Sequence, residues 1–402
     1  MKKIKINGAK ELSGTIKISG AKNSAVALIP ASLLSDGIVT IDNVPNISDI
    51  DALNEILEYL GAKVLRDNER IIIDQTNLQN KEIPEAKAKK LRASYYFMGA
   101  LLGKYKKAEI YFPGGCSIGD RPINLHLKGF EALGTKVEVT GGKIIAKAKK
   151  LTGTHIYMDI VSVGATINVM LASVLAEGTT TIDNPAKEPH IVDVANFLNT
   201  MGADIRGAGT DVIKINGVKE LSGNITYSVV PDQIEAGTFM LAAVASRGDI
   251  LIKNCVAEHL DSVIAKIVEI GANVEDLGDS IHVWMNKRPS KAVIKTLPYP
   301  GFPTDLQPQM GVCLSLSDGT SIINESIWES RFQYTEELNK MGAKITAQGK
   351  SAIFEGVKGL TGAPVYMTDL RAGAALIIAG ITANGTTEVY NLDHIDRGYE
   401  NI

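Results

Sequence analysis

Two long stretches of this 402-residue chain occur twice, at a constant distance. The segment INGAKELSGTIKIS at residues 6–19 returns as INGVKELSGNITYS at residues 215–228, which is 209 residues later. LTGTHIYMD, which starts at Leu151, returns as LTGAPVYMTD at Leu360, again 209 residues later. The chain therefore consists of two related halves, and any fold proposed for it has to be built twice.

Each half also contains a shorter repeat. The phrases LGAKV, LGTKV, MGADI, IGANV and MGAKI place their glycines at residues 61, 134, 202, 271 and 342. Most follow a strand pattern of period two, such as TTTID, and then a helix pattern, such as IVDVANFLNTMG. The glycine provides the left-handed residue that ends a helix. A sixth copy starts at GTTEVYNLDHIDRGYENI, and the chain stops inside it, so we expect the last repeat to be truncated.

A second helix pattern lies between these units. Its copies, such as SVGATINVMLASVLAEG and RAGAALIIAGITANG, are apolar nearly all round and rich in Ala and Gly. A helix of this kind is buried on every side. The sequence therefore predicts an α/β fold of two domains, each with three β-α-β-α-β-β repeats, in which helices form the centre and sheets the outside.

The first residues of these buried helices are predicted to be polar or charged. They are Lys22, Arg92, Ser162, Asp232, Asp305 and Arg371. Pseudo-symmetry should bring equivalent helix starts of one domain to one face. Helix N-termini carry partial positive charge and free N–H groups, which suit phosphate or carboxylate. We expect an anion-binding site there, although Asp305 could simply cap the helix that follows Pro303.

The second repeat is longer than the others because of the segment PGGCSIGDRP, residues 113–122. A thiol between glycines and an Asp-Arg pair predicts a functional loop, in which Gly114 and Gly115 permit hinging and Arg121 favours the thiolate of Cys116. The alternative is a thiol tolerated in a surface loop. Cys255 and Cys313 lie in apolar patterns and are expected to be core residues.

Composition excludes several classes of protein. The net charge of −3 gives no general attraction to nucleic acid or to an anionic membrane. Three cysteines without a CxxC pair argue against a disulfide framework and against a zinc site. The N-terminus has no apolar segment typical of a signal peptide, and the longest apolar run is too short to span a bilayer. We expect a cytoplasmic protein that binds neither metal nor membrane.

Several motifs together carry a resemblance to a known family. KNSAVALIPASLL, RAS, PGGCSIGDRP, SVGAT, PTDLQPQ, ESRF, TDLRAGAAL and DHIDRGYE resemble the UDP-N-acetylglucosamine enolpyruvyl transferases along the whole chain. The resemblance implies two inside-out domains joined by a double crossover, residues 22–229 and residues 1–21 with 230–402, and substrates in the cleft. It implies transfer of enolpyruvate from phosphoenolpyruvate to the 3′-hydroxyl of UDP-N-acetylglucosamine, the first committed step of peptidoglycan synthesis, without a cofactor.

The resemblance also assigns roles to residues. It implies that Cys116 is the acid and the target of fosfomycin, and that Asp305 is the base. The cations expected around phosphoenolpyruvate are Lys22, Arg121, Arg331, Arg371 and Arg397. The residues expected to bind the nucleotide sugar are Asn23, Arg92, Arg121, Pro122, Ile123, Asn124, Leu125, Ser162, Val163, Gly164, Asp305 and Ile327. Several cations suit a trianionic substrate that loses phosphate, and an acid with a base suits addition followed by elimination.

Some positions depart from the family pattern. Ser48 and Ile160 stand where some members carry lysines near the diphosphate, and Asn124 replaces a frequent Asp. One rival interpretation is the sister enzyme that acts on shikimate 3-phosphate, which lacks the cysteine loop. Another is a non-catalytic repeat scaffold, which would need no thiol–arginine loop. We expect a monomer or a weak homo-oligomer.

Overall fold

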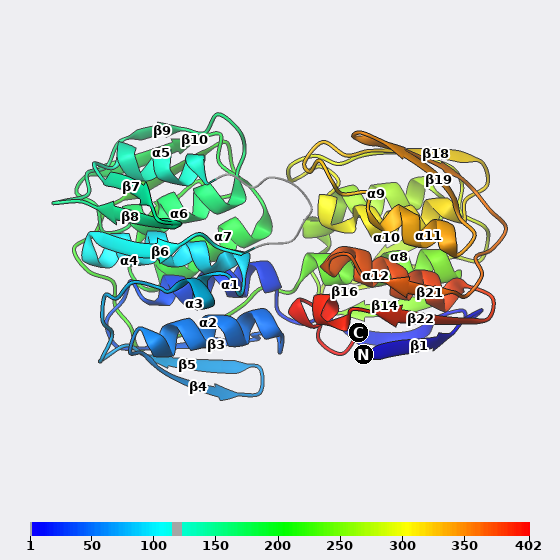
Figure 1. Ribbon diagram of the computed structural model, residues 1–402, viewed down its shortest axis with the longest axis horizontal. Coiled ribbons are helices and arrows are strands. Elements are labelled where there is room, and N and C mark those ends of the chain that lie inside the picture. Colours follow the sequence, from blue (N-terminus) through cyan, green and yellow to red (C-terminus); the bar gives the residue numbers. More distant parts are fainter. Residues whose placement is uncertain (1, 115–122) are drawn as a thin grey trace. The chain divides into compact units, whose positions relative to one another are not determined.

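The computed structural model describes residues 2–114 and 123–402 (Figure 1). The described residues group into two compact units. Residues 20–114 and 123–230 belong to the first unit, and residues 2–19 and 231–402 belong to the second. Each unit has its own core of buried apolar side chains. The N-terminal strands therefore belong with the C-terminal half of the chain, so the chain passes between the units twice.

The first unit alternates helices and strands. Its helices are α1 (Lys22–Ser32), α2 (Ser48–Tyr59), α3 (Glu85–Ala88), the 3₁₀ helix η1 (Arg92–Tyr95), α4 (Tyr96–Tyr105), α5 (Asn124–Ala132), α6 (Val163–Ser173) and α7 (Pro189–Thr200). Its strands are β3 (Ile38–Asp42), β4 (Lys63–Asp67), β5 (Arg70–Asp74), β6 (Lys107–Tyr111), β7 (Lys136–Thr140), β8 (Lys143–Lys147), β9 (His155–Tyr157), β10 (Thr179–Asp183), β11 (Asp204–Arg206), β12 (Val212–Asn216) and β13 (Ile225–Ser228).

The second unit follows the same plan. Its helices are α8 (Gln233–Ser246), η2 (Ala257–Leu260), α9 (Asp261–Glu269), η3 (Thr304–Leu306), α10 (Gln307–Ser315), α11 (Tyr334–Lys340), α12 (Leu370–Thr382) and η4 (Leu392–Arg397). Its strands are β1 (Lys3–Asn7), β2 (Ser13–Lys17), β14 (Asp249–Lys253), β15 (Asn273–Asp276), β16 (Ser280–Trp284), β17 (Val293–Lys295), β18 (Thr320–Asn324), β19 (Lys344–Gln348), β20 (Ser351–Glu355), β21 (Pro364–Tyr366) and β22 (Thr386–Tyr390).

Within the described ranges, the strands of each unit form three small sheets. The orders are β13-β3-β5-β4, β6-β8-β7 and β11-β12-β10-β9 in the first unit, and β15-β16-β14-β2, β17-β18-β20-β19 and β1-β22-β21 in the second. The run β9-α6-β10-α7-β11-β12 is one complete β-α-β-α-β-β repeat, with β9 parallel to β10 and the others antiparallel. The predicted α/β fold class is therefore confirmed.

The Ala- and Gly-rich helices lie at the centre of each unit, with sheets outside (Figure 1). Every residue of α6 from Gly164 to Ser173 is buried. Helices α4 and α6 approach closely because α4 has a glycine at the contact. A Cβ on Gly99 would lie only 2.6 Å from the Asn168 carbonyl oxygen. The amphipathic helices end as predicted, since the glycines that follow them, such as Gly61 with φ of 99°, have positive φ.

An asparagine recurs where the central strand of a repeat ends. Asn43, Asn184, Asn254 and Asn391 all have positive φ, between 54° and 64°. Each donates its side-chain amide to the backbone carbonyl of the residue that follows the neighbouring parallel strand: Val229, Met158, Ile18 and Met367, respectively. These bonds fasten the ends of paired strands, close to the starts of the buried helices.

Candidate active site

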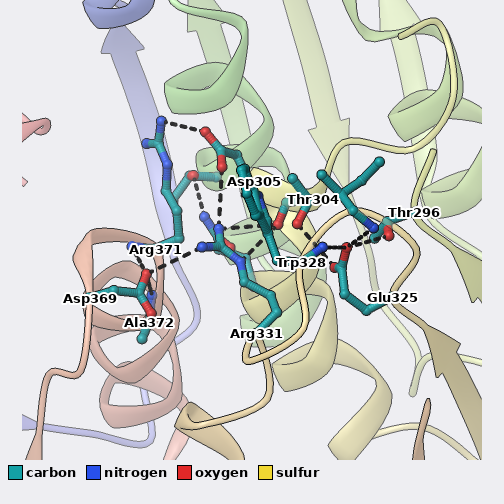
Figure 2. Close-up of polar contacts among 12 residues, drawn as sticks. Thr296, Thr304, Asp305, Glu325, Trp328, Arg331, Asp369, Arg371 and Ala372 are labelled. Carbon is teal, nitrogen blue, oxygen red and sulfur yellow. Dashed lines mark hydrogen bonds and ion pairs between the residues drawn. The ribbon is translucent and has the colours of Figure 1, made fainter. Parts of the chain in front are cut away.

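The centre of the polar cluster in the second unit is the carboxylate of Asp305, which two arginines hold (Figure 2). Arg331 Nη2 donates to Asp305 Oδ1 at 3.2 Å, and Arg371 Nη2 donates to Oδ2 at 3.0 Å. Both arginines are buried, whereas the Asp305 side chain is 29% exposed. Three predicted site residues from separate parts of the chain therefore meet here, and one carboxylate oxygen faces each guanidinium.

A second carboxylate, Asp369, contacts the guanidinium of Arg331 and the backbone of Arg371 (Figure 2). Asp369 Oδ1 lies 3.6 Å from Arg331 Nη1 and accepts from the backbone N–H groups of Arg371 and Ala372. It is therefore the N-cap of α12 and a counter-charge for Arg331 at once. This residue was not predicted, although its place two residues before the expected helix start at Arg371 is a sequence signal for a cap.

Arg371 is held in place by further buried groups. Its guanidinium lies over the Tyr399 ring, 5.4 Å from the centroid, as in a cation–π contact. The Tyr399 hydroxyl lies 2.8 Å from Thr238 Oγ1 and accepts from Gln309 Nε2 at 3.3 Å. Burial opposes the charged form, but the carboxylate of Asp305, together with smaller effects from Tyr399 and Asp232, raises the pKa of Arg371 above its ordinary value. A permanent positive charge is thus kept in a buried site.

Two other predicted residues of the second unit lie on adjoining segments. Arg397 is the last residue of η4, two residues before Tyr399. Ile327 lies in the loop after β18, where its backbone N–H donates to Glu325 Oε1 at 2.8 Å. Arg331 lies at the end of the same loop, and its Nη2 donates to the carbonyl oxygen of Thr304 at 3.2 Å. This loop and η3, which carries Asp305, are therefore tied together.

In the first unit, Lys22 is the first residue of α1, as predicted, and forms a partly buried ion pair. Its Nζ lies 2.9 Å from Asp49 Oδ2, and the two side chains are 12% and 8% exposed. Asp49 belongs to the first turn of α2, where a carboxylate is stabilised by the helix dipole. The pairing fixes the position of the lysine at a helix start, which suits an anion site. Asp49 was not predicted, and its signal was only its position in that first turn.

Arg92 belongs to a second cluster in the first unit. Its guanidinium lies over the Tyr95 ring at 5.6 Å, and Tyr95 packs edge-on against His126, with ring centroids 4.9 Å apart. His126 Nδ1 lies 2.8 Å from the Asn168 amide nitrogen. Burial, with a smaller effect from the charge of Arg92, lowers the pKa of His126 to about 3. The imidazole is therefore neutral, and Arg92 carries the charge of this cluster.

The segment Ser162–Gly164 reaches the same cluster. Ser162 is the N-cap of α6 and accepts from the Ala165 N–H at 3.3 Å. A Cβ on Gly164 would lie 2.8 Å from the Tyr95 hydroxyl and 2.9 Å from His126 Cε1. A larger residue than glycine would therefore displace the aromatic pair. Val163 follows the cap and is half-buried.

The predicted residues Ile123, Asn124 and Leu125 form the start of α5, the helix that also carries His126. Ile123 is buried, and Leu125 packs against the core of the first unit. The structure thus brings this segment, Arg92 and Gly164 together around His126. Asn23 lies beside Lys22 in the first turn of α1 and is half-buried.

Three predicted site residues, Cys116, Arg121 and Pro122, lie outside the described residues. Gly114, at the start of that segment, donates its N–H to the Ala88 carbonyl oxygen at 3.3 Å, and a Cβ there would collide with the Lys89 carbonyl oxygen. Close backbone approach therefore explains this glycine. The two described thiols are core residues, as predicted: burial raises the pKa of Cys255 to about 11 and that of the fully buried Cys313 further still.

The predicted helix starts need two corrections. Arg92 begins the 3₁₀ helix η1, and the α-helix starts four residues later at Tyr96. Asp305 lies inside η3, and no side chain caps that segment, so its interpretation as an N-cap is wrong. In both places a 3₁₀ turn precedes the α-helix, and the polar side chain projects from that turn. Ser162 and Asp232 are true N-caps.

Neither a metal site nor a membrane span emerges from the described residues. No group of three or more His, Cys, Asp or Glu side chains within residues 2–114 and 123–402 could hold a metal ion. No helix of the same ranges is both long and apolar enough to cross a membrane.

Comparison with known proteins agrees with this architecture. The family described as EPSP synthase (3-phosphoshikimate 1-carboxyvinyltransferase) matches residues 6–402, and the chain belongs to this family of carboxyvinyltransferases. The enolpyruvyl transferase NikO from Streptomyces tendae has a similar structure, with a TM-score of 0.89 and 25% identity over 99% of this chain and 94% of that one. An EPSP synthase from Acinetobacter baumannii, 18% identical, shares the fold with a TM-score of 0.73 over 97% of this chain and 94% of that one.

The relatives with higher sequence identity have names that specify the acceptor substrate. A protein of Clostridium botulinum, 55% identical over 100% of this chain and 97% of its own length, is a UDP-N-acetylglucosamine 1-carboxyvinyltransferase. A protein of Caldanaerobacter subterraneus, 57% identical over 100% of this chain and 96% of its own length, is UDP-N-acetylglucosamine 1-carboxyvinyltransferase 3. The resemblance inferred from the motifs is therefore confirmed.

Proposed function

We propose that this chain transfers the enolpyruvyl group of phosphoenolpyruvate to the 3′-hydroxyl of UDP-N-acetylglucosamine and releases phosphate. The observation that carries this proposal is the carboxylate of Asp305 held between Arg331 and Arg371. A base beside fixed cations suits attack by a neutral hydroxyl on a highly anionic substrate. The names of the relatives at 55% and 57% identity support the choice of acceptor. The product would enter peptidoglycan synthesis.

The cations account for the binding of phosphoenolpyruvate. Arg331, Arg371 and Arg397 are assigned to the surroundings of its carboxylate, because guanidinium groups recognise carboxylates well. Lys22, Arg121 and Arg397 are assigned to its phosphate. When the substrate carboxylate approaches Arg331 and Arg371, it competes with Asp305 for their N–H donors. Asp305 then becomes free to accept a proton, so binding of one substrate prepares the base for the other.

The reaction follows an addition and an elimination. Asp305 accepts the proton of the 3′-hydroxyl while the 3′-oxygen of the sugar bonds to C2 of phosphoenolpyruvate. Cys116 donates its thiol proton to C3, which converts the double bond into a methyl group. In the second step C3 returns a proton to the thiolate, the C2–O bond to phosphate breaks, and the double bond forms again. The proton on Asp305 leaves with phosphate, so both side chains return to their starting states.

The nucleotide sugar is assigned to the residues that the resemblance implies. They are Asn23, Arg92, Arg121, Pro122, Ile123, Asn124, Leu125, Ser162, Val163, Gly164, Asp305 and Ile327. The cluster of Arg92, Tyr95 and His126 offers a charge and aromatic faces, which suit a nucleotide diphosphate. We also propose residues 22–229 and residues 1–21 with 230–402 as the functional domains, a monomer or weak homo-oligomer, and a cytoplasmic location.

The alternative acceptor is shikimate 3-phosphate, which appears in the family description. The segment PGGCSIGDRP argues against it, because the sister enzymes lack a cysteine loop. The test is to incubate the protein with phosphoenolpyruvate and UDP-N-acetylglucosamine and to identify the product by NMR. Vinyl protons on an ether at the 3′-oxygen are expected. An unchanged nucleotide sugar, with turnover of shikimate 3-phosphate instead, would overturn the proposal.

A further inference from the structure

Glu325 interrupts the repeated pattern of asparagines at the ends of the central strands. It lies six residues after Gly319, just as Asn43, Asn184 and Asn254 lie six residues after Gly37, Gly178 and Gly248. In those repeats the residue that follows the neighbouring parallel strand is apolar: Val229, Met158 and Ile18. Here the equivalent residue, after β17, is Thr296. Both members of the pair are therefore changed in the repeat that contains β17 and β18.

In the other repeats the asparagine side chain makes one such hydrogen bond to the neighbouring strand. The carboxylate of Glu325 instead accepts four hydrogen bonds (Figure 2). Its Oε1 accepts from Thr296 Oγ1 at 2.8 Å, from the Ile327 N–H at 2.8 Å and from the Trp328 N–H at 3.1 Å. Its Oε2 accepts from Thr304 Oγ1 at 3.0 Å. Glu325 is only 1% exposed. A buried carboxylate is costly unless it is fully hydrogen-bonded, and this one is bonded by three separate segments.

The hydrogen bond that joins the ends of β18 and β17 does not require the Glu325 carboxylate. Ser326 Oγ donates to the backbone carbonyl of Thr296, which is the kind of bond that the asparagines make in the other repeats. The Ser326 N–H also donates to Thr296 Oγ1, at 2.9 Å. The strand ends are therefore fastened by a different residue, and the bonds of Glu325 to Thr304, Ile327 and Trp328 are additional.

These additional bonds connect the two segments that carry the proposed machinery. Thr304 precedes Asp305 in η3, while Ile327 and Trp328 start the loop that ends at Arg331. Thr304 is held twice, through its hydroxyl by Glu325 and through its carbonyl oxygen by Arg331. A shift of η3 against the loop would therefore change the distance between Asp305 and Arg331.

We propose that Glu325 is a positioning residue whose buried carboxylate, through the hydroxyl of Thr304, sets the place of Asp305 relative to the loop of residues 325–331. This inference rests on the proposed function, because it takes Asp305 as the base. Glu325 itself does not touch the substrates in this account. Its effect on the reaction passes through η3 to Asp305 and through the loop to Ile327 and Arg331.

The decisive variant is Thr304→Val, which removes the hydroxyl and keeps the shape of the side chain. Loss of a hydrogen bond to a charged acceptor predicts a fall in kcat of about 10-fold or more, with the KM for UDP-N-acetylglucosamine changed by less than about 3-fold. Thr304→Ser keeps the hydroxyl and should restore most of kcat. Thr387→Val is the matched control, because Thr387 is fully buried in β22 and its hydroxyl has no hydrogen-bond partner among the described residues.

A second measurement does not depend on turnover. Hydrogen exchange at the Ile327 and Trp328 amides should be faster in Glu325→Gln than in the unsubstituted protein, because an uncharged acceptor binds them less strongly. If Thr304→Val keeps kcat within 2-fold, or if Thr304→Ser is as impaired as Thr304→Val, the positioning role is wrong. Unchanged exchange in Glu325→Gln would also contradict it. Absence of turnover in the unsubstituted protein would instead count against the proposed function, and the exchange result would still decide the role of Glu325.

Discussion

Arg371 Nη2 lies 3.0 Å from Asp305 Oδ2, and this bond joins the starts of two buried helices that are 66 residues apart in the chain. Arg331 holds the other oxygen of the same carboxylate. The proposed base and the proposed cations therefore neutralise one another. In the proposed reaction, the carboxylate of phosphoenolpyruvate competes with Asp305 for the N–H donors of the two arginines. The pair explains how two buried arginines are balanced by charge.

Substitution of Asp305 tests the base directly. Asp305→Ala should lower kcat by about 100-fold or more, the usual scale for loss of general acid–base catalysis. Affinity for UDP-N-acetylglucosamine, measured by calorimetry, should stay within a few-fold, because most of the residues assigned to that ligand remain. Turnover within a few-fold of the unsubstituted enzyme would mean that Asp305 serves only to pair the arginines.

Glu235 makes stability depend on pH. Burial, and then the nearby charge of Asp232, raise the pKa of Glu235 from 4.5 to about 8. The folded protein therefore binds this proton more tightly than the unfolded chain, so the free energy of unfolding should fall as pH rises from about 4.5 to 8. Glu235→Gln keeps an acceptor for the Ser19 N–H, which now lies 3.0 Å from Oε2. It should stabilise the protein at pH 8 by at least about 1 kcal/mol and have much less effect near pH 5.

Thermal unfolding across this pH range checks the effect of Glu235. The matched control is Glu275→Gln, because Glu275 is exposed on β15 in the same unit. That variant should follow the unsubstituted protein at every pH. If Glu235→Gln were less stable at pH 8 than the unsubstituted protein, the buried carboxyl would not be protonated in the folded state.

Gly164 should be intolerant of a methyl group. In Gly164→Ala the new Cβ would lie within 3 Å of the Tyr95 hydroxyl and of His126 Cε1, so the aromatic pair beneath Arg92 has to move. We expect a destabilisation of about 1–3 kcal/mol and a higher KM for UDP-N-acetylglucosamine. Gly359→Ala is the control, since Gly359 is exposed and the nearest atom to a Cβ there is 3.5 Å away. If both variants had the same stability and the same KM for UDP-N-acetylglucosamine, the cluster of Arg92, Tyr95 and His126 would have no role in binding the nucleotide sugar.

The thiols should differ sharply in reactivity. Burial raises the pKa of both Cys255 and Cys313, so neither supplies thiolate at neutral pH. An epoxide phosphonate such as fosfomycin should therefore add once per chain, at Cys116. Cys116→Asp should keep a proton donor and some activity but lose the label, whereas Cys116→Ser should lose most activity because a hydroxyl is a poor acid. Peptide mapping identifies the labelled residue, and a label on either buried thiol would contradict the assignment.

The repeats made the fold predictable, because the period of 209 residues and the shorter repeat within each half indicate where similar helices and strands recur. The glycine phrases correctly placed the helix ends at residues such as Gly61 and Gly342. The exact helix starts were less predictable. Arg92 and Asp305 occupy positions equivalent to the α-helix starts of other repeats, but both lie in 3₁₀ turns. Such a turn has the same local sequence preferences as the first turn of an α-helix, so only packing distinguishes them.

The charged residues proposed to contact substrates are suggested by motifs, whereas the residues that hold them were not predicted. Asp49, Asp369 and Glu325 each pair with a group far away in the sequence. An isolated carboxylate near a helix start or strand end is usually solvated, so its sequence neighbours do not reveal a buried partner. For Glu325 a signal was nevertheless present, because it replaces an asparagine that recurs in four other repeats.

Phosphate release with different acceptors tests the central claim most directly. The unsubstituted protein is mixed with phosphoenolpyruvate and either no acceptor, UDP-N-acetylglucosamine or shikimate 3-phosphate, and inorganic phosphate is measured over time. We expect sustained release with UDP-N-acetylglucosamine, in equal amount to the acceptor consumed, and none above background in the other two mixtures. Release that does not depend on UDP-N-acetylglucosamine, or that requires shikimate 3-phosphate, would contradict it.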